Sequence, residues 1–348
     1  MEEAWYLEEA PAPDEDILVQ ARARQDSLTK PKGALGRLEE VVIQLAGNQR
    51  TLTPGITKPA IVVFAGDHGV AAEGVSAYPQ AVTGEMVRNF SAGGAAITVL
   101  ARNLNVPFRV FNMGTVDSLE DLPNVEDRRV AAGTQNICNS PAMDARQLED
   151  CMAAGKEAVD SAGDIDLFIG GEMGIGNSTI AAALAVAHTK LAAQAMVGRG
   201  TGIDDQGFAK KSAVVTRALS KHLPHMRVGI DYLQRIGGFE VNALAAAYIR
   251  AAQKGIAVMV DGYICTAAAM AAVKVNPSIR PWLFFSHCSA EPGHEKLLNK
   301  LEAKPLLSLE MRLGEGSGAA LALPILQSAC ALHREMASFD EAGVSRSV

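Results

Sequence analysis

The sequence predicts an α/β protein with a mostly parallel sheet that is covered by helices on both faces. Short apolar runs alternate with alanine-rich stretches of helical length along the 348 residues. The runs are continuously apolar, a pattern typical of parallel strands that are buried on both sides. Each run ends in glycine or polar residues, and ligands of open α/β sheets bind beyond the carboxyl ends of the strands.

The chain begins with predicted helices. Asp14 follows a proline-containing stretch and indicates the start of a helix, because aspartate is a common N-cap residue. Apolar residues then recur at helical spacing, at Leu35, Leu38, Val41, Val42 and Leu45. We expect an amphipathic helix over about residues 35–49, which Thr53-Pro54-Gly55 ends.

Five apolar runs predict the strands, at residues 60–65, 108–113, 165–170, 257–260 and 282–285. The segments that follow them are Gly66-Asp67-His68-Gly69, Gly114-Thr115, Gly171-Glu172-Met173-Gly174, Asp261-Gly262 and Ser286-His287. Because the carboxyl ends of parallel strands lie at one edge of a sheet, we expect these segments to converge on one site. Asp67 and His68 either orient a substrate there or form a turn in which Asp67 binds local backbone amides.

Three further segments are candidates for ligand binding. Residues 170–179 place glycines before Asn177, two hydroxyl residues and an alanine-rich helix, which favours an anion at the helix N-terminus. Their spacing matches neither a P-loop nor a dinucleotide GxGxxG motif. The loop 197–202 precedes Lys210 and Lys211, which either neutralise a ligand or lie on a solvated face. Residues 286–291 contain adjacent histidine and cysteine, which point to opposite sides of an extended chain and so disfavour a nucleophile pair.

Glu315 lies in the most informative segment, Met311-Arg312-Leu313-Gly314-Glu315-Gly316-Ser317-Gly318. The glycines permit a tight turn and a close approach by a ligand. The segment opens a predicted helix, whose N-terminus favours anions and keeps a nearby carboxylate ionised. Glu315 is therefore a candidate general base beside a phosphorylated substrate, or else a residue that only caps the helix. The run 319–332 is apolar all round, and we expect it to be buried.

Composition excludes several classes of function. A net charge of −7 argues against a nucleic-acid-binding surface, and no apolar run is long enough to span a membrane. The acidic start lacks a basic-then-apolar signal pattern, so we expect a cytoplasmic protein. The five cysteines show no CxxC spacing and the seven histidines no HExxH spacing, so we expect neither a disulfide framework nor a metal site.

Several segments together resemble the nicotinate-nucleotide:5,6-dimethylbenzimidazole phosphoribosyltransferase family of the cobalamin pathway. They run in order from about residue 10 to 335 and include Lys30-Pro31-Lys32-Gly33-Ala34-Leu35-Gly36-Arg37-Leu38-Glu39, Ala65-Gly66-Asp67-His68-Gly69-Val70, residues 171–179, Gly229-Ile230-Asp231, Gly237-Gly238-Phe239-Glu240, Asp261-Gly262, residues 286–291 and residues 311–320. None of these motifs is decisive alone, but the ordered set is specific.

The resemblance implies transfer of a phosphoribosyl group from nicotinate mononucleotide to 5,6-dimethylbenzimidazole or a related lower-ligand base. The products are α-ribazole 5′-phosphate and nicotinate, for assembly of the cobalamin nucleotide loop. Glu315 corresponds to the general base, and the reaction as implied uses no cofactor and no metal. The family also implies a homodimer that acts on small molecules and binds neither nucleic acid nor membrane.

The resemblance also implies roles for further residues. Gly200 and Ser289 correspond to phosphate-contacting positions, with Gly174 and Gly176 nearby. Lys211 corresponds to a phosphate-neutralising lysine that reaches the site from the partner subunit. Glu172 corresponds to a second acidic site residue, and Gly314 lies against the substrate. Tyr78, Met86 and Met173 correspond to the pocket for the aromatic base, where an aromatic ring and two thioethers suit a flat, apolar ligand; the two methionines are alternatively ordinary core residues.

The fold implied by the resemblance has two parts. Residues 56–317 form a Rossmann-like domain that binds nucleotide and base, and residues 1–55 with 318–348 form a small helical domain from both chain ends. Part of the apolar surface of 319–332 then lies in a dimer interface. Two other classes stay open: a dehydrogenase, which needs the GxGxxG spacing that this chain lacks, and a binding protein without catalysis, against which an intact Glu315 argues.

Overall fold

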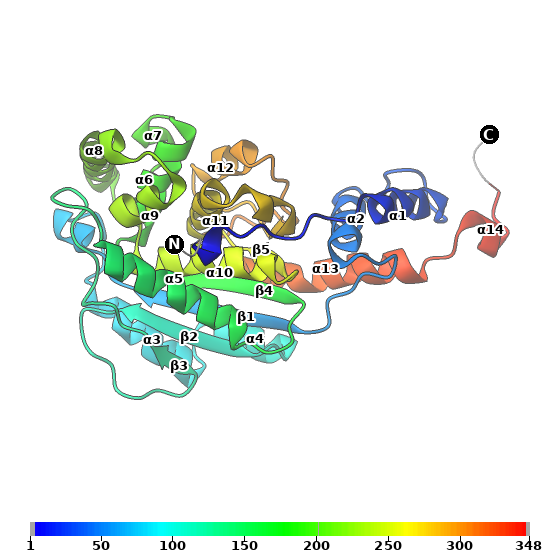
Figure 1. The fold of residues 1–348 in the computed structure, drawn as a ribbon, viewed down its shortest axis with the longest axis horizontal. Helices are drawn as coiled ribbons and strands as arrows, with labels where there is room; N and C mark the ends of the chain where they lie inside the picture. Colours follow the sequence, from blue (N-terminus) through cyan, green and yellow to red (C-terminus); the bar gives the residue numbers. More distant parts are fainter. Residues whose placement is uncertain (1–3, 201, 346–348) are drawn as a thin grey trace.

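The centre of the molecule is a six-stranded sheet in which every pair of neighbouring strands is parallel (Figure 1). The computed structural model describes residues 4–200 and 202–345, so Thr201 of the predicted second glycine loop lies outside the described residues. The strands are β1 (Pro59–Gly66), β2 (Phe108–Gly114), β3 (Val125–Asp127), β4 (Leu167–Met173), β5 (Ala257–Val260) and β6 (Leu283–Phe285). Their order, β3-β2-β1-β4-β5-β6, is that of a Rossmann-type doubly wound sheet, which confirms the predicted fold class.

Helices pack against both faces of the sheet. One core contains residues of α5 (Ala145–Asp160), α6 (Asn177–Thr189), α7 (Ala193–Met196), α8 (Asp205–His222), α9 (Gly229–Ile236), α10 (Phe239–Gln253), α11 (Tyr263–Val275) and α12 (His294–Lys300). The other core contains residues of α2 (Arg37–Gln49), α3 (Ala81–Ala92), α4 (Ala96–Leu104) and α13 (Ser317–Glu335). The remaining helices are α1 (Glu15–Ser27), which packs on α2, and the short α14 (Phe339–Ala342); η1 (Trp5–Leu7), η2 (Gly69–Glu73), η3 (Leu223–His225) and η4 (Pro277–Trp282) are 3-10 turns.

The continuous apolar character of the strands follows from this layering. Along β1, Val62 and Phe64 enter the core with α10, while Ile61 and Val63 enter the core with α13. Because successive side chains of a strand point to opposite faces, a strand between two cores must be apolar at every position.

Most of the predicted boundaries are confirmed. The Asp14 side chain accepts the N–H of Ile17 at 3.0 Å, so α1 begins at Glu15 as the N-cap pattern indicates. The helix expected from about 35 begins at Arg37, because Gly33 and Gly36 adopt positive φ and turn the chain first. Trp282 was expected in the last strand but ends the 3-10 turn η4.

The predicted end of β4 is wrong by three residues, because the strand continues through Met173. Gly170 and Gly171 allow other segments to pack closely against the two faces of β4. A Cβ on Gly170 would lie 2.3 Å from Cδ1 of Leu244 on α10, and a Cβ on Gly171 would lie 2.2 Å from the carbonyl oxygen of Glu315. Residues 170 and 171 are therefore strand residues against which other segments pack, and the glycine loop begins only at Gly174.

The expectation of all-round burial for residues 319–332 is wrong for the single chain. Ala320 and Leu323 are buried, but Leu321 is 37% exposed. The helix α13 contacts α2, and α1 packs on α2 at the same end of the molecule, away from α6 to α9 (Figure 1). The division into residues 56–317 and residues 1–55 with 318–348 stays a prediction.

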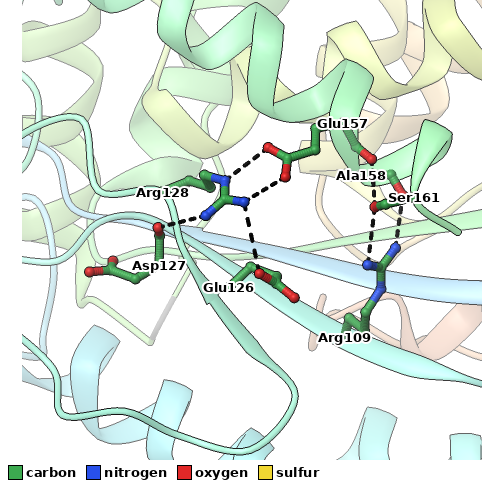
Figure 2. A network of polar contacts seen from close by, with 7 residues as sticks. All are labelled: Arg109, Glu126, Asp127, Arg128, Glu157, Ala158 and Ser161. Atoms are coloured by element: carbon green, nitrogen blue, oxygen red, sulfur yellow. Dashed lines mark hydrogen bonds and ion pairs between the residues drawn. The ribbon is translucent and has the colours of Figure 1, made fainter.

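The edge strand β3 was missed, because its three residues carry no apolar run. Figure 2 shows how neighbouring charges hold this edge against α5. The guanidinium of Arg128 binds both carboxylate oxygens of Glu157, and its Nη1 donates to the carbonyl of Asp127. On β2, Arg109 donates to the carbonyl of Ala158 at the end of α5, at 3.0 Å. The pairing of β3 with β2 is therefore supported by contacts between distant segments rather than by a signal in the local sequence.

Candidate active site

A cavity of about 470 Å³ lies beyond the carboxyl ends of β4, β5 and β6. Its walls come from the end of β4 with the start of α6, the segment after β5 with the start of α11, and the segment after β6. The loop before α13, the helix α3 with the segment before it, and Gly200 complete the walls. The lining residues are Tyr78, Val82, Met86, Glu172, Met173, Gly174, Ile175, Asn177, Ser178, Gly200, Asp261, Gly262, Tyr263, Ile264, Cys265, His287, Ser289, Glu291, Arg312, Leu313, Gly314 and Glu315.

The expectation that all five strand ends meet here is wrong. Among the described lining residues, none comes from the segments directly after β1 or β2. The end of β1 lies beneath the glycine loop instead, since a Cβ on Gly174 would lie 2.1 Å from the carbonyl oxygen of Gly66. Asp67 accepts hydrogen bonds from the Thr83 hydroxyl at 2.6 Å and from the Val116 N–H at 2.9 Å. Asp67 therefore has the structural role, bonding nearby groups rather than facing the cavity.

His68 is also a structural residue. Its Nε2 lies 2.7 Å from Oε1 of Glu240, and both side chains are fully buried. Gly176 belongs to this support, since a Cβ there would lie 3.1 Å from Cβ of His68. Gly176 is the N-cap of α6 and is not among the described lining residues, in contrast to Gly174.

Glu315 lines the cavity with a side chain held on several sides. Its residue is 6% exposed, and its Oε2 accepts the N–H of Ile97 at the start of α4, at 3.4 Å. Its backbone lies against Gly171 of β4. Its φ of 65° is in the left-handed region, which costs a non-glycine residue about 1–2 kcal/mol and persists only where the surroundings enforce it.

The environment of the Glu315 carboxylate differs from the one expected. Asp261 already occupies two amides at the N-terminus of α13: its carboxylate accepts the N–H of Gly316 at 3.2 Å and of Ala319 at 2.9 Å. Burial, together with the negative charge of Asp261, raises the pKa of Glu315 above its ordinary value, against the lowering effect of the Ile97 amide. Instead of being held ionised, Glu315 is a carboxylate with increased proton affinity.

Glu172 is a second buried carboxylate of the cavity. Its Oε2 accepts a hydrogen bond from the side-chain amide of Asn177 at the start of α6. Burial and the charges of Asp261, Glu240 and Glu315 raise its pKa well above the ordinary value. Carboxyl groups that share a dry site in this way retain protons more readily than exposed ones.

One end of the cavity combines hydroxyl groups, a glycine and a buried lysine. Ser178, Gly200 and Ser289 line it, and Nζ of Lys211 lies 2.9 Å from Oγ of Ser178. The Lys211 residue is only 1% exposed, which makes the solvated-face alternative wrong. In the single chain it reaches this end from α8, and its supply by a partner subunit stays a prediction.

The other end is apolar. Tyr78, Met86 and Met173 line it as the sequence resemblance implied, together with Val82 and Leu313. Tyr78 and Leu313 are 54% and 58% exposed, so they stand at the mouth of the cavity. Met86 and Met173 also pack against the core around α13, so they are core residues as well as lining residues of the cavity.

The lining residues without an individual role on sequence grounds include Asp261, His287 and Arg312. Arg312 donates from Nη1 to the carbonyl of Gly200, 3.3 Å away. Asp261 could have been found as the first polar residue after the strand 257–260, whereas the partners of Arg312 and His287 are set by distant segments.

Residues 4–200 and 202–345 contain no group of three or more histidine, cysteine, aspartate or glutamate side chains placed to hold a metal ion. Within the same residues, every helix is too short or too polar to cross a membrane.

A family model described as Phosphoribosyltransferase matches residues 10–344 of this chain. Two relatives bear the name nicotinate-nucleotide–dimethylbenzimidazole phosphoribosyltransferase. The protein from Xanthomonas axonopodis pv. citri is 55% identical over 347 residues, 99% of each chain. The protein from Pseudomonas aeruginosa strain UCBPP-PA14 is 54% identical over 344 residues, 98% of each chain.

Two solved structures from Thermus thermophilus have the same fold. The crystal structure of a nicotinate-nucleotide-dimethylbenzimidazole phosphoribosyltransferase superposes with a TM-score of 0.91 at 43% identity, covering 96% of this chain and 100% of that chain. A second, described as CobT, superposes with a TM-score of 0.92 at 44% identity, covering 95% of this chain and 100% of the other.

Proposed function

Since this chain belongs to the nicotinate-nucleotide–dimethylbenzimidazole phosphoribosyltransferase family, we propose that it transfers phosphoribose from nicotinate mononucleotide to 5,6-dimethylbenzimidazole. The products are nicotinate and α-ribazole 5′-phosphate, a component of the cobalamin nucleotide loop. One observation carries the proposal: a single cavity joins an end with Lys211, an apolar end and the buried carboxylate of Glu315.

The chemistry needs one proton acceptor. One ring nitrogen of dimethylbenzimidazole attacks C1′ of the ribose while its other nitrogen loses a proton to the Glu315 carboxylate. The bond from C1′ to the pyridinium nitrogen of nicotinate breaks, and its electrons neutralise that nitrogen. The departing ring therefore requires no acid, and the raised pKa of Glu315 suits it to accept the proton.

The geometry of the cavity suits a displacement on one ribose. The incoming base and the departing ring must lie on opposite faces of C1′, so a β-nucleotide gives an α-product. Holding two flat rings in this arrangement is a positioning task, which can supply up to about 7–11 kcal/mol of the barrier. We assign the base to the apolar end, with Tyr78, Met86 and Met173, and the phosphate to the end with Gly200 and Ser289.

Glu172 and the neighbouring glycines complete the proposed site. Glu172 accepts a hydrogen bond from a ribose hydroxyl or a protonated ring nitrogen. Gly174 and Gly314 line the cavity without a side chain, and a Cβ on Gly314 would lie 2.3 Å from Oε1 of Glu172. Gly176 contributes indirectly, by starting α6 behind Ser178.

Replacement of Lys211 by methionine is expected to raise KM for nicotinate mononucleotide about 10- to 100-fold, because a charge-assisted hydrogen bond is worth about 1.5–3 kcal/mol.

Burial lowers the pKa of Lys211 to about 8. The lysine is thus charged below this pH and neutral above it, and kcat/KM of the wild type should fall as the pH rises through about 8. Lys211→Met should lack this alkaline limb of the pH profile. Initial rates at varied pH measure it.

The matched control for Lys211 is the preceding residue, Lys210, which is exposed on the same helix. Lys210→Met should keep both the KM and the alkaline limb of the wild type. An unchanged KM in Lys211→Met would contradict the assignment of the phosphate to this end.

The reaction is tested by incubating the protein with nicotinate mononucleotide and measuring nicotinate release. Release should depend on added dimethylbenzimidazole and yield one ribazole phosphate for each nicotinate. Absence of release, with nucleotide binding retained, would favour the noncatalytic binding protein and overturn the proposal. Competition among benzimidazoles, purines and phenols in one mixture then determines the preferred base.

Two further proposals rest on the family alone: a homodimer and a cytoplasmic location. Sedimentation equilibrium across a range of protein concentrations tests the first, with twice the 36.6 kDa chain mass expected.

A further inference from the structure

We propose that Asp261 is a positioning residue that holds the backbone beside Glu315 and places a negative charge next to its carboxylate. This inference rests on the proposed function, because it concerns the residue assigned as the base. Asp261 directly follows β5 and is 1% exposed. It is 54 residues from Glu315 in sequence yet bonds the amide directly after it.

The contacts of Asp261 replace a missing helix cap. The N-cap of α13 is Gly316, which has no side chain to accept the free amides of the first turn. Asp261 accepts two of them, with Oδ2 toward the N–H of Gly316 and Oδ1 toward the N–H of Ala319. A carboxylate from the sheet therefore fixes the point at which the Glu315 loop becomes a helix.

The packing around α13 leaves little freedom for an alternative arrangement. A Cβ on Gly318 would lie 2.1 Å from Nδ1 of His287 and 2.9 Å from Oδ1 of Asp261. On the opposite side, Gly171 lies against the carbonyl of Glu315. Held between β4 and Asp261, Glu315 keeps its left-handed backbone, which is unfavourable without such support.

Asp261 affects Glu315 through its negative charge, in addition to its hydrogen bonds to the backbone. The titratable or charged groups around Glu315 come from several walls. They are Tyr78 before α3, Glu172 from β4, Asp261 after β5, Tyr263 and Cys265 from α11, His287 and Glu291 after β6, Arg312 from the Glu315 loop, and Lys211 behind Ser178. Of these, Asp261 is the one whose charge raises the pKa of Glu315, in addition to burial. Nδ1 of His287 lies 3.7 Å from Oδ1 of Asp261.

The test is the pH dependence of kcat in Asp261→Asn. Asparagine keeps the size and one acceptor but removes the charge, so Glu315 should remain deprotonated to lower pH. The acid limb of kcat should then move to lower pH, and the plateau should fall about 10- to 100-fold, because the base is weaker and less well held. An acid limb that stays in place would overturn the inference, since a purely structural role would not move it.

Two further variants keep the test decisive. Asp261→Glu retains the charge, so its acid limb should stay where the wild type has it. If Asp261→Asn does not fold, Asp261→Ser replaces it, and an unmoved limb in that variant equally overturns the inference. Asp67→Asn removes another buried carboxylate that follows a strand and bonds a backbone amide; it should leave the acid limb where the wild type has it.

Failure of this inference is distinguishable from failure of the proposed function. A wild-type protein that releases no nicotinate contradicts the function itself. A wild-type protein that is active, with an acid limb insensitive to Asp261→Asn, contradicts only the role of Asp261.

Discussion

Replacement of Glu315 by glutamine is expected to lower kcat by about 10²- to 10⁴-fold, the usual contribution of a general base. The amide has nearly the same shape and can still accept the Ile97 N–H, but it cannot take a proton from the attacking base. KM for nicotinate mononucleotide should change little, because the phosphate is bound at the other end of the cavity. Initial rates of nicotinate release at saturating dimethylbenzimidazole measure both parameters.

The pH profile provides an independent check on Glu315. Because the pKa of Glu315 is raised, wild-type activity should be lost on its acid side as the pH falls through that raised value. Glu315→Gln should lack this limb. The control is Glu310→Gln, an exposed glutamate of the same loop, which should keep wild-type rates and the limb. Retention of more than about half of wild-type kcat in Glu315→Gln would contradict the role of the base.

The same substitution should stabilise the protein at neutral pH. A carboxyl group whose folded pKa is above its unfolded value contributes stability at low pH and loses it as the pH rises through the folded pKa. Glu315 is such a group, so its charged form opposes folding at neutral pH. Thermal unfolding at pH 7 should show a higher midpoint for Glu315→Gln, as is common where an active site is built at the expense of stability.

The second large effect is expected from Gly171→Ala. The new Cβ would lie 2.2 Å from the carbonyl oxygen of Glu315 and 2.9 Å from the N of Gly316, so the Glu315 loop must move away from β4. A displacement of about 1 Å in a reacting group can cost 10²-fold in rate, and we expect kcat to fall by about that factor. Stability should fall by about 1–3 kcal/mol through overpacking. Nicotinate-release rates and urea unfolding measure the two effects.

The adjacent glycine provides the matched control. Gly170→Ala places its Cβ on the opposite face of β4, where it would meet Leu244 and Tyr248 of α10. It should destabilise the protein to a similar degree but reduce kcat much less, because the Glu315 loop is not touched. Equal losses of kcat in the two variants would show that strand damage, rather than displacement of Glu315, causes the effect.

The parts of the fold that were predicted correctly are those with a strong local signal. The strand 257–260 is buried on both sides and reads as a continuous apolar run, and Asp14 caps the helix that follows it. The missed or misplaced parts depend on distant contacts. β3 has no apolar run and is held by Arg128 and Glu157, and β4 continues through Met173 because its last residues pair with β1.

The site residues also differ in whether the local sequence or distant contacts determine their placement. Glu315 stands in a glycine-rich segment that indicates a site, whereas Gly200 and Ser289 are identified only through the family resemblance; all three line the cavity. The burial of Asp67 and His68 could not be predicted, because it results from the glycine loop at 174 crossing above the end of β1. The occupation of the α13 N-terminus by Asp261 was equally hidden, since the two segments are far apart in sequence.

The most direct measurement of the central claim is the configuration at C1′ of the product formed from β-nicotinate mononucleotide and dimethylbenzimidazole. NMR of the isolated product should show the α-anomer, with one nicotinate released for each product molecule, because the base attacks opposite the departing ring. A β-anomer would contradict direct displacement in this cavity. Release of nicotinate with free ribose 5-phosphate in place of a ribazole phosphate would equally contradict it.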